Sequence, residues 1–412
     1  MRRVLTGPWS LALAFLVVHA VLVAVNLLDT YHQPLGDVTG VYRFWVDFWR
    51  TEHRLVGIDT PWVYPVGALP PMLAADAFGD AWYGQAWLGI VVLLDAVATL
   101  LLARRSLPLA WWWVAFTACL GPIALARIDS IALPVAVVGV LYAAERPMVA
   151  SALFTLAAWI KVWPAALVAA MLVAGRRSAR VVAGAALTSA VVIAVAIAVG
   201  GRSTIFSFVA AQAGRGLQIE APVTSLWLWE AAGGQGGTTI YYDRAILTFQ
   251  VTGQGVEATA GVMTAVLAVG VLVVAGLGLL ARLRGGDPGE VLALTALGFV
   301  AAVIALNKVG SPQYLTWYVA PVLLGLLVAP RRFRVPAVLV LVLAALTQVV
   351  YPWFYYELLL LKPVLLATLT LRNLLELVLL GWTLSVLAGL HGPAASRSGR
   401  KTHRAVPAPA GR

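Results

Sequence analysis

The sequence predicts an all-α polytopic membrane protein with about twelve transmembrane helices and two long loops between them. Of its 412 residues, 61% are hydrophobic and only 11% are charged, whereas a soluble globular protein carries about a quarter charged residues. Apolar runs of roughly 20 residues, the length that a membrane-crossing helix needs, recur along the whole chain. This distribution leaves no room for a separate soluble domain.

The apolar runs give the order of the expected membrane segments. The first run follows Arg2 and Arg3 as in a signal peptide, but no clean small-residue cleavage site follows, so it is interpreted as a retained helix. The expected segments are 9–27, 82–103, 107–127, 130–144, 148–160, 163–175, 179–200, 259–281, 289–306, 314–330, 334–350 and 364–389. The pair within 148–175 is short for two full crossings, which suits a re-entrant or tilted pair.

Arginine clusters predict the orientation of the chain. The clusters between segments, the N-terminus and the basic tail all fall on one side, which the positive-inside rule assigns to the cytoplasm. The net charge of +11 then reflects orientation and not binding of nucleic acid. We expect one membrane domain over residues 1–389, a disordered basic tail over 390–412, and outer loops over 28–80 and 201–258.

Three of the four lysines lie at expected outer helix ends, where this rule predicts few cations. Lys308 lies in "ALNKVGSPQYLTWY", and Lys161 and Lys362 end other apolar runs. A cation in such a place favours an anionic partner. The alternative is a lysine that snorkels to the interface, which is the preferred interpretation for Lys362.

The first outer loop contains an amphipathic segment with Tyr42, Trp45 and Arg43, as expected for a helix lying in the membrane interface. Asp37 precedes this helix. It is either a general base that accepts a proton from a hydroxyl or the N-terminal cap of the helix. Asp47, within the helix, is expected on its solvated face.

The second outer loop groups Arg215, Gln218 and Glu220 within a few residues. An arginine there suits a phosphate, and the other two suit hydroxyl groups, although a structural pair between Arg215 and Glu220 explains them equally well. Arg372 and Asn373 in the last segment should face the bundle interior, in a packing or a substrate role.

Signatures of cofactor chemistry are weak throughout. The histidines lack zinc-site spacing, Cys119 is the single cysteine, and neither a Rossmann fingerprint nor a serine nucleophile elbow is present. No metal site and no cofactor are predicted. Dependence on a divalent metal stays open, because Asp37, Asp129 and Glu220 could meet in space.

Five segments together resemble glycosyltransferase family 87, a branch of the C-type membrane glycosyltransferases. They are "GDVTGVYRFWVDFW", "WVYPVGALPPML", "AAWIKVWPAALVAAMLVAGRR", "AGRGLQIE" and "LNKVGSPQYLTWYVAP", within a similarity that extends from about residue 9 to residue 389. The family includes the polyprenyl-phosphate-mannose-dependent alpha-mannosyltransferases of high-G+C bacteria.

The resemblance implies an inverting hexosyltransferase of the bacterial plasma membrane, working on its outer face among membrane lipids. It implies a polyprenyl-phosphate sugar, mannose above all, as donor and a glycolipid or lipoglycan as acceptor. The family's catalytic aspartate corresponds by position to Asp37. The donor phosphate is then expected at Lys161, Arg215 and Lys308. The sugar or acceptor contacts are expected at Tyr42, Tyr64, Gln218, Glu220, Gln313 and Tyr314.

Two other classes of protein remain alternatives. A transporter or lipid flippase would also explain broken helices and the intramembrane Arg372, but polar residues gather on one face and no inverted halves are visible. A structural subunit of a cell-envelope complex would tolerate substitutions at Asp37 and Arg215.

Overall fold

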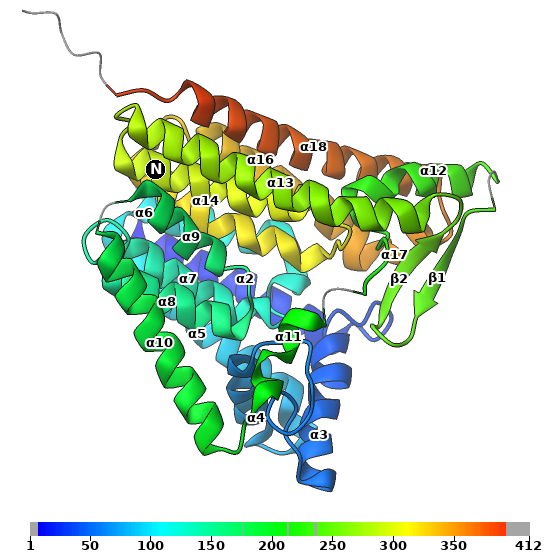
Figure 1. Cartoon of the computed structure of the whole chain (residues 1–412). Helices are drawn as coiled ribbons and strands as arrows, with labels where there is room; N and C mark the ends of the chain where they lie inside the picture. The colour runs from blue at the N-terminus through cyan, green and yellow to red at the C-terminus, as the bar shows by residue number, and fades with distance from the viewer. Residues whose placement is uncertain (1–6, 176, 212–213, 235–236, 393–412) are drawn as a thin grey trace, which may run out of the picture.

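The computed structural model describes residues 7–175, 177–211, 214–234 and 237–392, which form a predominantly helical molecule (Figure 1). A helix coincides with every expected membrane segment. The bundle consists of α2 (Pro8–Leu28), α5 (Tyr83–Arg105), α6 (Leu107–Leu120), α7 (Asp129–Tyr142), α8 (Pro147–Ile160), α9 (Ala165–Ala174), α10 (Ser178–Ala198), α13 (Val256–Leu283), α14 (Pro288–Ala305), α15 (Val319–Val328), α16 (Arg334–Gln348) and α18 (Pro363–Gly389).

Eight helices in the described part of the chain are long and apolar enough to cross a membrane, so the chain is a polytopic membrane protein. The shorter apolar helices are α7, α8, α9 and the segment Pro312–Val328 that includes α15. The sequence predicts about twelve crossings, and length and composition support eight of them. The short pair within 148–175 is α8 and α9.

The basic loops gather at one end of the bundle. Arg105 lies 3.7 Å from Glu145 across two loops, Arg332 lies 3.6 Å from Glu290 across two others, and Arg284 donates to the carbonyl of Ala388 at 2.8 Å. The structure therefore confirms that these arginines share one end. Residues 393–412, most of the expected tail, lie outside the described residues.

The opposite end, here called the Asp37 end, carries the long connections. The first contains the π-helical turn η1 (Asp37–Tyr42), the amphipathic helix α3 (Arg43–Glu52), η2 (Val66–Ala68), α4 (Leu69–Asp76) and η3 (Asp80–Trp82). On α3, Val46 is buried while Phe44 is exposed. Helix α3 lies at the edge of the molecule, whereas α4 packs against α5 (Figure 1). Helix α3 covers most of the amphipathic segment that the sequence predicts.

The second long connection shows that an all-α prediction is incomplete. It contains η5 (Ser203–Phe206), α11 (Ser207–Ala210), η6 (Pro222–Thr224), α12 (Ser225–Ala232) and an antiparallel hairpin of β1 (Thr239–Asp243) and β2 (Thr248–Thr252). The hairpin pairs Thr239 with Thr252 and Asp243 with Thr248. Together with α12 it lies beside the ends of α13 and α18 (Figure 1).

A second apolar cluster joins this connection to the bundle. It contains Leu217, Leu228 and Val251 from the connection and Leu366 from α18, together with Leu358 from the short helix α17 (Tyr355–Leu359), which follows η8 (Val349–Trp353). The cluster is separate from the main core of the bundle. It anchors the polar residues that lie between Leu217 and the start of α12.

Helix α14 lies at the centre of the bundle, because nearly all of its residues are buried. A helix that is apolar on every side must be covered on every side. Asp287 caps its start by accepting hydrogen bonds from the backbone N–H groups of Gly289 and Glu290, at 2.9 and 3.0 Å. At its other end, α14 is followed by residues 306–311 and the turn η7 (Pro312–Tyr318), which lie at the Asp37 end.

Candidate active site

Asp37 and Arg127 form an ion pair at the Asp37 end. The Nε atom of Arg127 lies 3.0 Å from Oδ2 of Asp37, and the side chains are 6% and 39% exposed respectively. Asp37 is the first residue of η1, and no side chain caps that turn. The cap role is therefore wrong for Asp37, whose carboxylate instead faces a buried cation and the surface.

Arg127 is held in place by three further groups. It donates to the carbonyl oxygens of Pro34 at 2.9 Å and Ala126 at 2.7 Å, and to the hydroxyl of Tyr351 at 2.8 Å. Such a planar fork of donors has little freedom to turn once these bonds are made. Among the described residues, Oδ1 of Asp37 has no hydrogen-bond donor, so one carboxylate oxygen stays free to accept a proton.

Tyr42 has a different role from the substrate contact that the sequence predicts. Its ring is 1% exposed and its hydroxyl accepts a hydrogen bond from the backbone N–H of Ile128 at 3.0 Å. A side chain buried to this extent offers no surface to a sugar. Tyr42 instead fixes the turn that carries Arg127 and Asp129.

Asp129 and Lys161 extend the site beyond Arg127. Asp129 is fully buried at the start of α7, where Trp317 donates its indole N–H to Oδ1 at 2.6 Å. The ammonium of Lys161, at the end of α8, lies 3.9 Å from Oδ2 of Asp129 and 4.4 Å from the ring centre of Tyr64. This cation therefore lies between a carboxylate and an aromatic face, with 16% of its side chain exposed.

Arg215 adds a second cation in electrostatic range of Lys161 and Tyr314. Its Nε atom is buried and has no hydrogen-bond partner among the described residues. A buried donor without a partner is costly and suits an anion that enters the site. The predicted pairing of Arg215 with Glu220 is wrong, because Glu220 pairs elsewhere.

Glu220 is buried and binds Arg372, whose Nη1 lies 3.2 Å from its Oε2. Arg372 also donates to the carbonyl of Glu220 at 2.6 Å and to the side chain of Asn373 at 2.7 Å. Glu376 approaches the same guanidinium at 3.8 Å. Glu220 is thus committed to packing rather than to a hydroxyl of the substrate, and Arg372 and Asn373 take the packing role.

Lys308 contributes through its backbone. Its carbonyl accepts the N–H of Gln218 at 3.0 Å, and a Cβ on Gly310 would lie 2.3 Å from the backbone nitrogen of Ala221. Only glycine fits so close an approach of two chain segments. In the described residues no ion pair joins the Lys308 ammonium to Asp37 or Asp129, and its phosphate role stays a prediction.

The remaining predicted contacts are placed around these groups. Gln218 is buried and bridges to Gln250 of the hairpin. The Oε1 atom of Gln313 accepts from the hydroxyl of Ser311 at 2.7 Å. The ring of Tyr314 is half-buried and stacks on Trp317 at 4.0 Å. Tyr64 thus contacts Lys161, Tyr314 packs on Trp317, and Gln218 belongs to the scaffold.

No group of three or more His, Cys, Asp or Glu side chains among the described residues is arranged to hold a metal ion. The three carboxylates that could have met, Asp37, Asp129 and Glu220, each face a different cation.

Three residues of the site are absent from the sequence prediction: Arg127, Tyr351 and Trp317. Arg127 could have been predicted from the sequence, because an arginine in an outer turn departs from the positive-inside pattern as clearly as Lys161 does. Tyr351 and Trp317 could not have been predicted in this way, since aromatic residues are common at the membrane interface.

Charged side chains buried in a membrane bundle mark a functional site, and here a free carboxylate and buried cations gather at one end of the helical bundle. The family model of glycosyltransferase family 87 matches residues 62–306, more than half of the chain. The chain is a member of glycosyltransferase family 87 and hence a membrane glycosyltransferase. No curated protein and no solved structure matches it.

Proposed function

We propose that this glycosyltransferase transfers a sugar, mannose, from a polyprenyl-phosphate donor to a hydroxyl of a lipid-linked or cell-envelope glycan. The proposal combines family membership with the arrangement of Asp37, Arg127, Lys161 and Arg215. It places the Asp37 end on the extracytoplasmic face of a bacterial plasma membrane, because the opposite end carries the arginine-rich loops.

Asp37 acts as the general base in this proposal. Its free Oδ1 takes the proton of the acceptor hydroxyl while that oxygen attacks the anomeric carbon of the donor. The bond from the anomeric carbon to the phosphate oxygen breaks on the opposite side, and the configuration inverts. Arg127 is a positioning residue, because it holds Oδ2 at 3.0 Å and keeps Oδ1 directed to the acceptor.

Lys161 and Arg215 receive the departing polyprenyl phosphate. The negative charge that develops on the leaving oxygen is stabilised by cations already fixed in a site with little water. Lys161 is held by Asp129 and Tyr64, whereas Arg215 has a donor with no protein partner. Tyr314 and Tyr64 offer aromatic faces to the sugar ring beside these cations.

The observation that carries the proposal is the position of the half-exposed Asp37 carboxylate. It has one free oxygen and pairs with Arg127 through the other. Two residues after Arg127, Asp129 pairs with the cation Lys161. A carboxylate suits a hydroxyl and a cation suits a phosphate, so these two groups match the two halves of the reaction.

The test uses the purified protein in lipid nanodiscs with a glycolipid extract as acceptor. Radiolabelled polyprenyl-phosphate mannose, polyprenyl-phosphate glucose and GDP-mannose are supplied in separate reactions, and the anomeric configuration of the product is determined. Transfer from a polyprenyl phosphate with inversion supports the proposal. Transfer from the nucleotide sugar alone, or uptake of sugar into sealed vesicles without transfer, contradicts it.

A further inference from the structure

A cavity of about 320 Å³ lies at the Asp37 end between the end of α2 and the start of α5. Its wall includes Asn26, Asp29, Gln33, Thr39 and Gln85. The volume is in the range of roughly 300 to 1,000 Å³ that small-molecule sites occupy. None of these residues takes part in the ion pairs around Arg127 and Lys161 described above.

The wall has hydrogen-bonding capacity that the protein leaves unused. Tyr83 and Asn26 belong to it, and the Tyr83 hydroxyl and Asn26 Oδ1 are buried without a hydrogen-bond partner among the described residues. Gln85 is exposed, and no described residue accepts or donates a hydrogen bond to its amide. Buried polar groups are almost always satisfied in native proteins, so a hydroxyl-rich ligand fits this wall.

The charge of the wall separates it from the phosphate site. The wall contains Asp29, Asp80 and Arg43, and the two carboxylates already pair with His32, Arg43 and Arg50, so the cavity has no excess of cations. Burial acts to raise the pKa of Asp29, but hydrogen bonds from His32 and Tyr31 bring it below its usual value, so the carboxylate stays ionised at neutral pH. The cavity thus lacks the cations that suit a phosphate, whereas its amide groups are good partners for uncharged hydroxyl groups.

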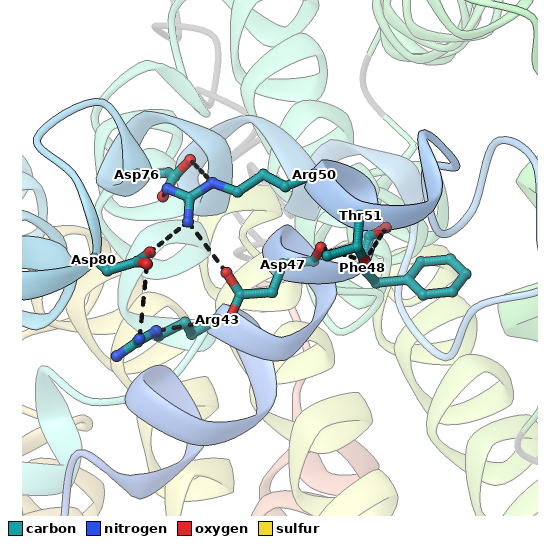
Figure 2. Close-up of polar contacts among 7 residues, drawn as sticks. All are labelled: Arg43, Asp47, Phe48, Arg50, Thr51, Asp76 and Asp80. Carbon is teal, nitrogen blue, oxygen red and sulfur yellow. Dashed lines mark hydrogen bonds and ion pairs between the residues drawn. The ribbon is translucent and has the colours of Figure 1, made fainter.

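The cavity borders the chain segment that carries the base. Gly36, immediately before Asp37, and Thr39, two residues after it, both belong to the wall. Arg43 and Asp80 both belong to the wall, and their side chains approach each other to 3.9 Å (Figure 2). A sugar seated here lies next to η1, the turn that begins with Asp37.

We propose that this cavity binds an uncharged sugar unit of the acceptor glycan and so presents the acceptor hydroxyl to Asp37. The inference rests on the proposed transferase function and adds to it a second subsite with its own chemistry. Donor phosphate and acceptor sugar then bind to separate sets of residues, one cationic and one with uncharged amide and hydroxyl groups.

The experiment measures binding and transfer separately with the full chain in nanodiscs. The probes are methyl α-mannopyranoside and methyl α-glucopyranoside, whose binding is followed by saturation-transfer-difference NMR. Their use as acceptors is followed by transfer from radiolabelled polyprenyl-phosphate mannose. The variants are Gln85→Ala and Thr39→Trp, the second of which fills the cavity. Gln254→Ala, an exposed glutamine outside the cavity wall, is the matched control.

Because Gln85→Ala removes one hydrogen bond to the ligand, it should weaken glycoside binding and raise the acceptor KM about fivefold. The donor KM should stay unchanged. Thr39→Trp should abolish saturable glycoside binding, and Gln254→Ala should behave as wild type. Unchanged glycoside binding in Gln85→Ala, or equal weakening in Gln254→Ala, overturns the inference. If the wild type transfers no sugar but its glycoside binding still depends on Gln85, the proposed function is rejected and the binding cavity is not.

Discussion

Two arginines at the Asp37 end, Arg127 and Arg50, pair with carboxylates in opposite ways. Arg127 is buried and faces a single carboxylate, that of Asp37, while its other donors bind carbonyl and hydroxyl groups. Arg50 is about one-third exposed and lies among Asp47, Asp76 and Asp80 (Figure 2).

The comparison distinguishes a reactive carboxylate from structural ones. In the Arg50 cluster, Asp80 is shared between Arg50 and Arg43, and Asp76 accepts two bonds from Arg50, so these oxygens are occupied. That cluster joins α3 to α4 and to η3, the turn that precedes α5. The Asp37 carboxylate is held on one oxygen only, which leaves the other for chemistry.

Apart from substitutions of Asp37 itself, Arg127→Gln is expected to lower kcat the most. Asp37 loses its fixed partner, and Pro34 and Tyr351 lose a donor, so we expect kcat to fall on the order of a hundredfold. A second variant distinguishes a positioning role from a general loss of structure: Arg127→Lys keeps the positive charge and should recover part of kcat. Equal loss in both variants, with normal folding by circular dichroism, would contradict a positioning role.

Lys161→Met tests the phosphate site. Removing a charged donor should raise the donor KM about tenfold or more, with a smaller change in the acceptor KM. Lys362→Met is the matched control, because Lys362 is exposed and forms no ion pair with the described residues. A donor KM that rises equally in both variants would remove Lys161 from the site.

Arg50→Met tests the structural cluster. Three carboxylates would then lack their shared cation, and we expect the free energy of unfolding to fall by about 1–2 kcal/mol, with a modest loss of activity. Thermal unfolding in nanodiscs provides the measurement. A fall in kcat as deep as that of Arg127→Gln, without loss of stability, would mean that the cluster takes part in catalysis.

The smallest effect is expected for Asp47→Asn. Asp47 is 42% exposed and pairs with Arg43 at 3.7 Å and Arg50 at 3.1 Å, and exposed pairs contribute at most about 1 kcal/mol. Transfer activity and thermal stability should both stay close to wild type. A strong loss of activity here would erase the distinction between the two arginine clusters.

The positions of the helices follow from the sequence, because an apolar run of sufficient length can only be a helix in lipid. The hairpin was missed, although "TIYYD" and "TFQVT" are rich in β-branched and aromatic residues that favour strands. It lies in a long connection of an otherwise helical chain, and the long apolar runs that locate the membrane helices give no information about such a connection.

The site was predicted in part. Asp37 and Lys161 stand out locally, as a carboxylate and a cation on a face where charge is unexpected. The roles of Tyr42 and Glu220 depend on partners far along the chain, Ile128 and Arg372, the latter 152 residues away. Burial and pairing of this kind come from tertiary packing, so residue type and spacing could not reveal them.

The most direct measurement is the kinetics of sugar transfer by Asp37→Asn beside Asp47→Asn, with a polyprenyl-phosphate sugar as donor. The amide keeps the shape of the side chain but cannot accept the proton, so kcat should fall about a thousandfold while the donor KM stays near wild type. Asp47→Asn should keep its activity. An active Asp37→Asn, or equal losses in the two variants, would contradict the assignment of Asp37 as the base.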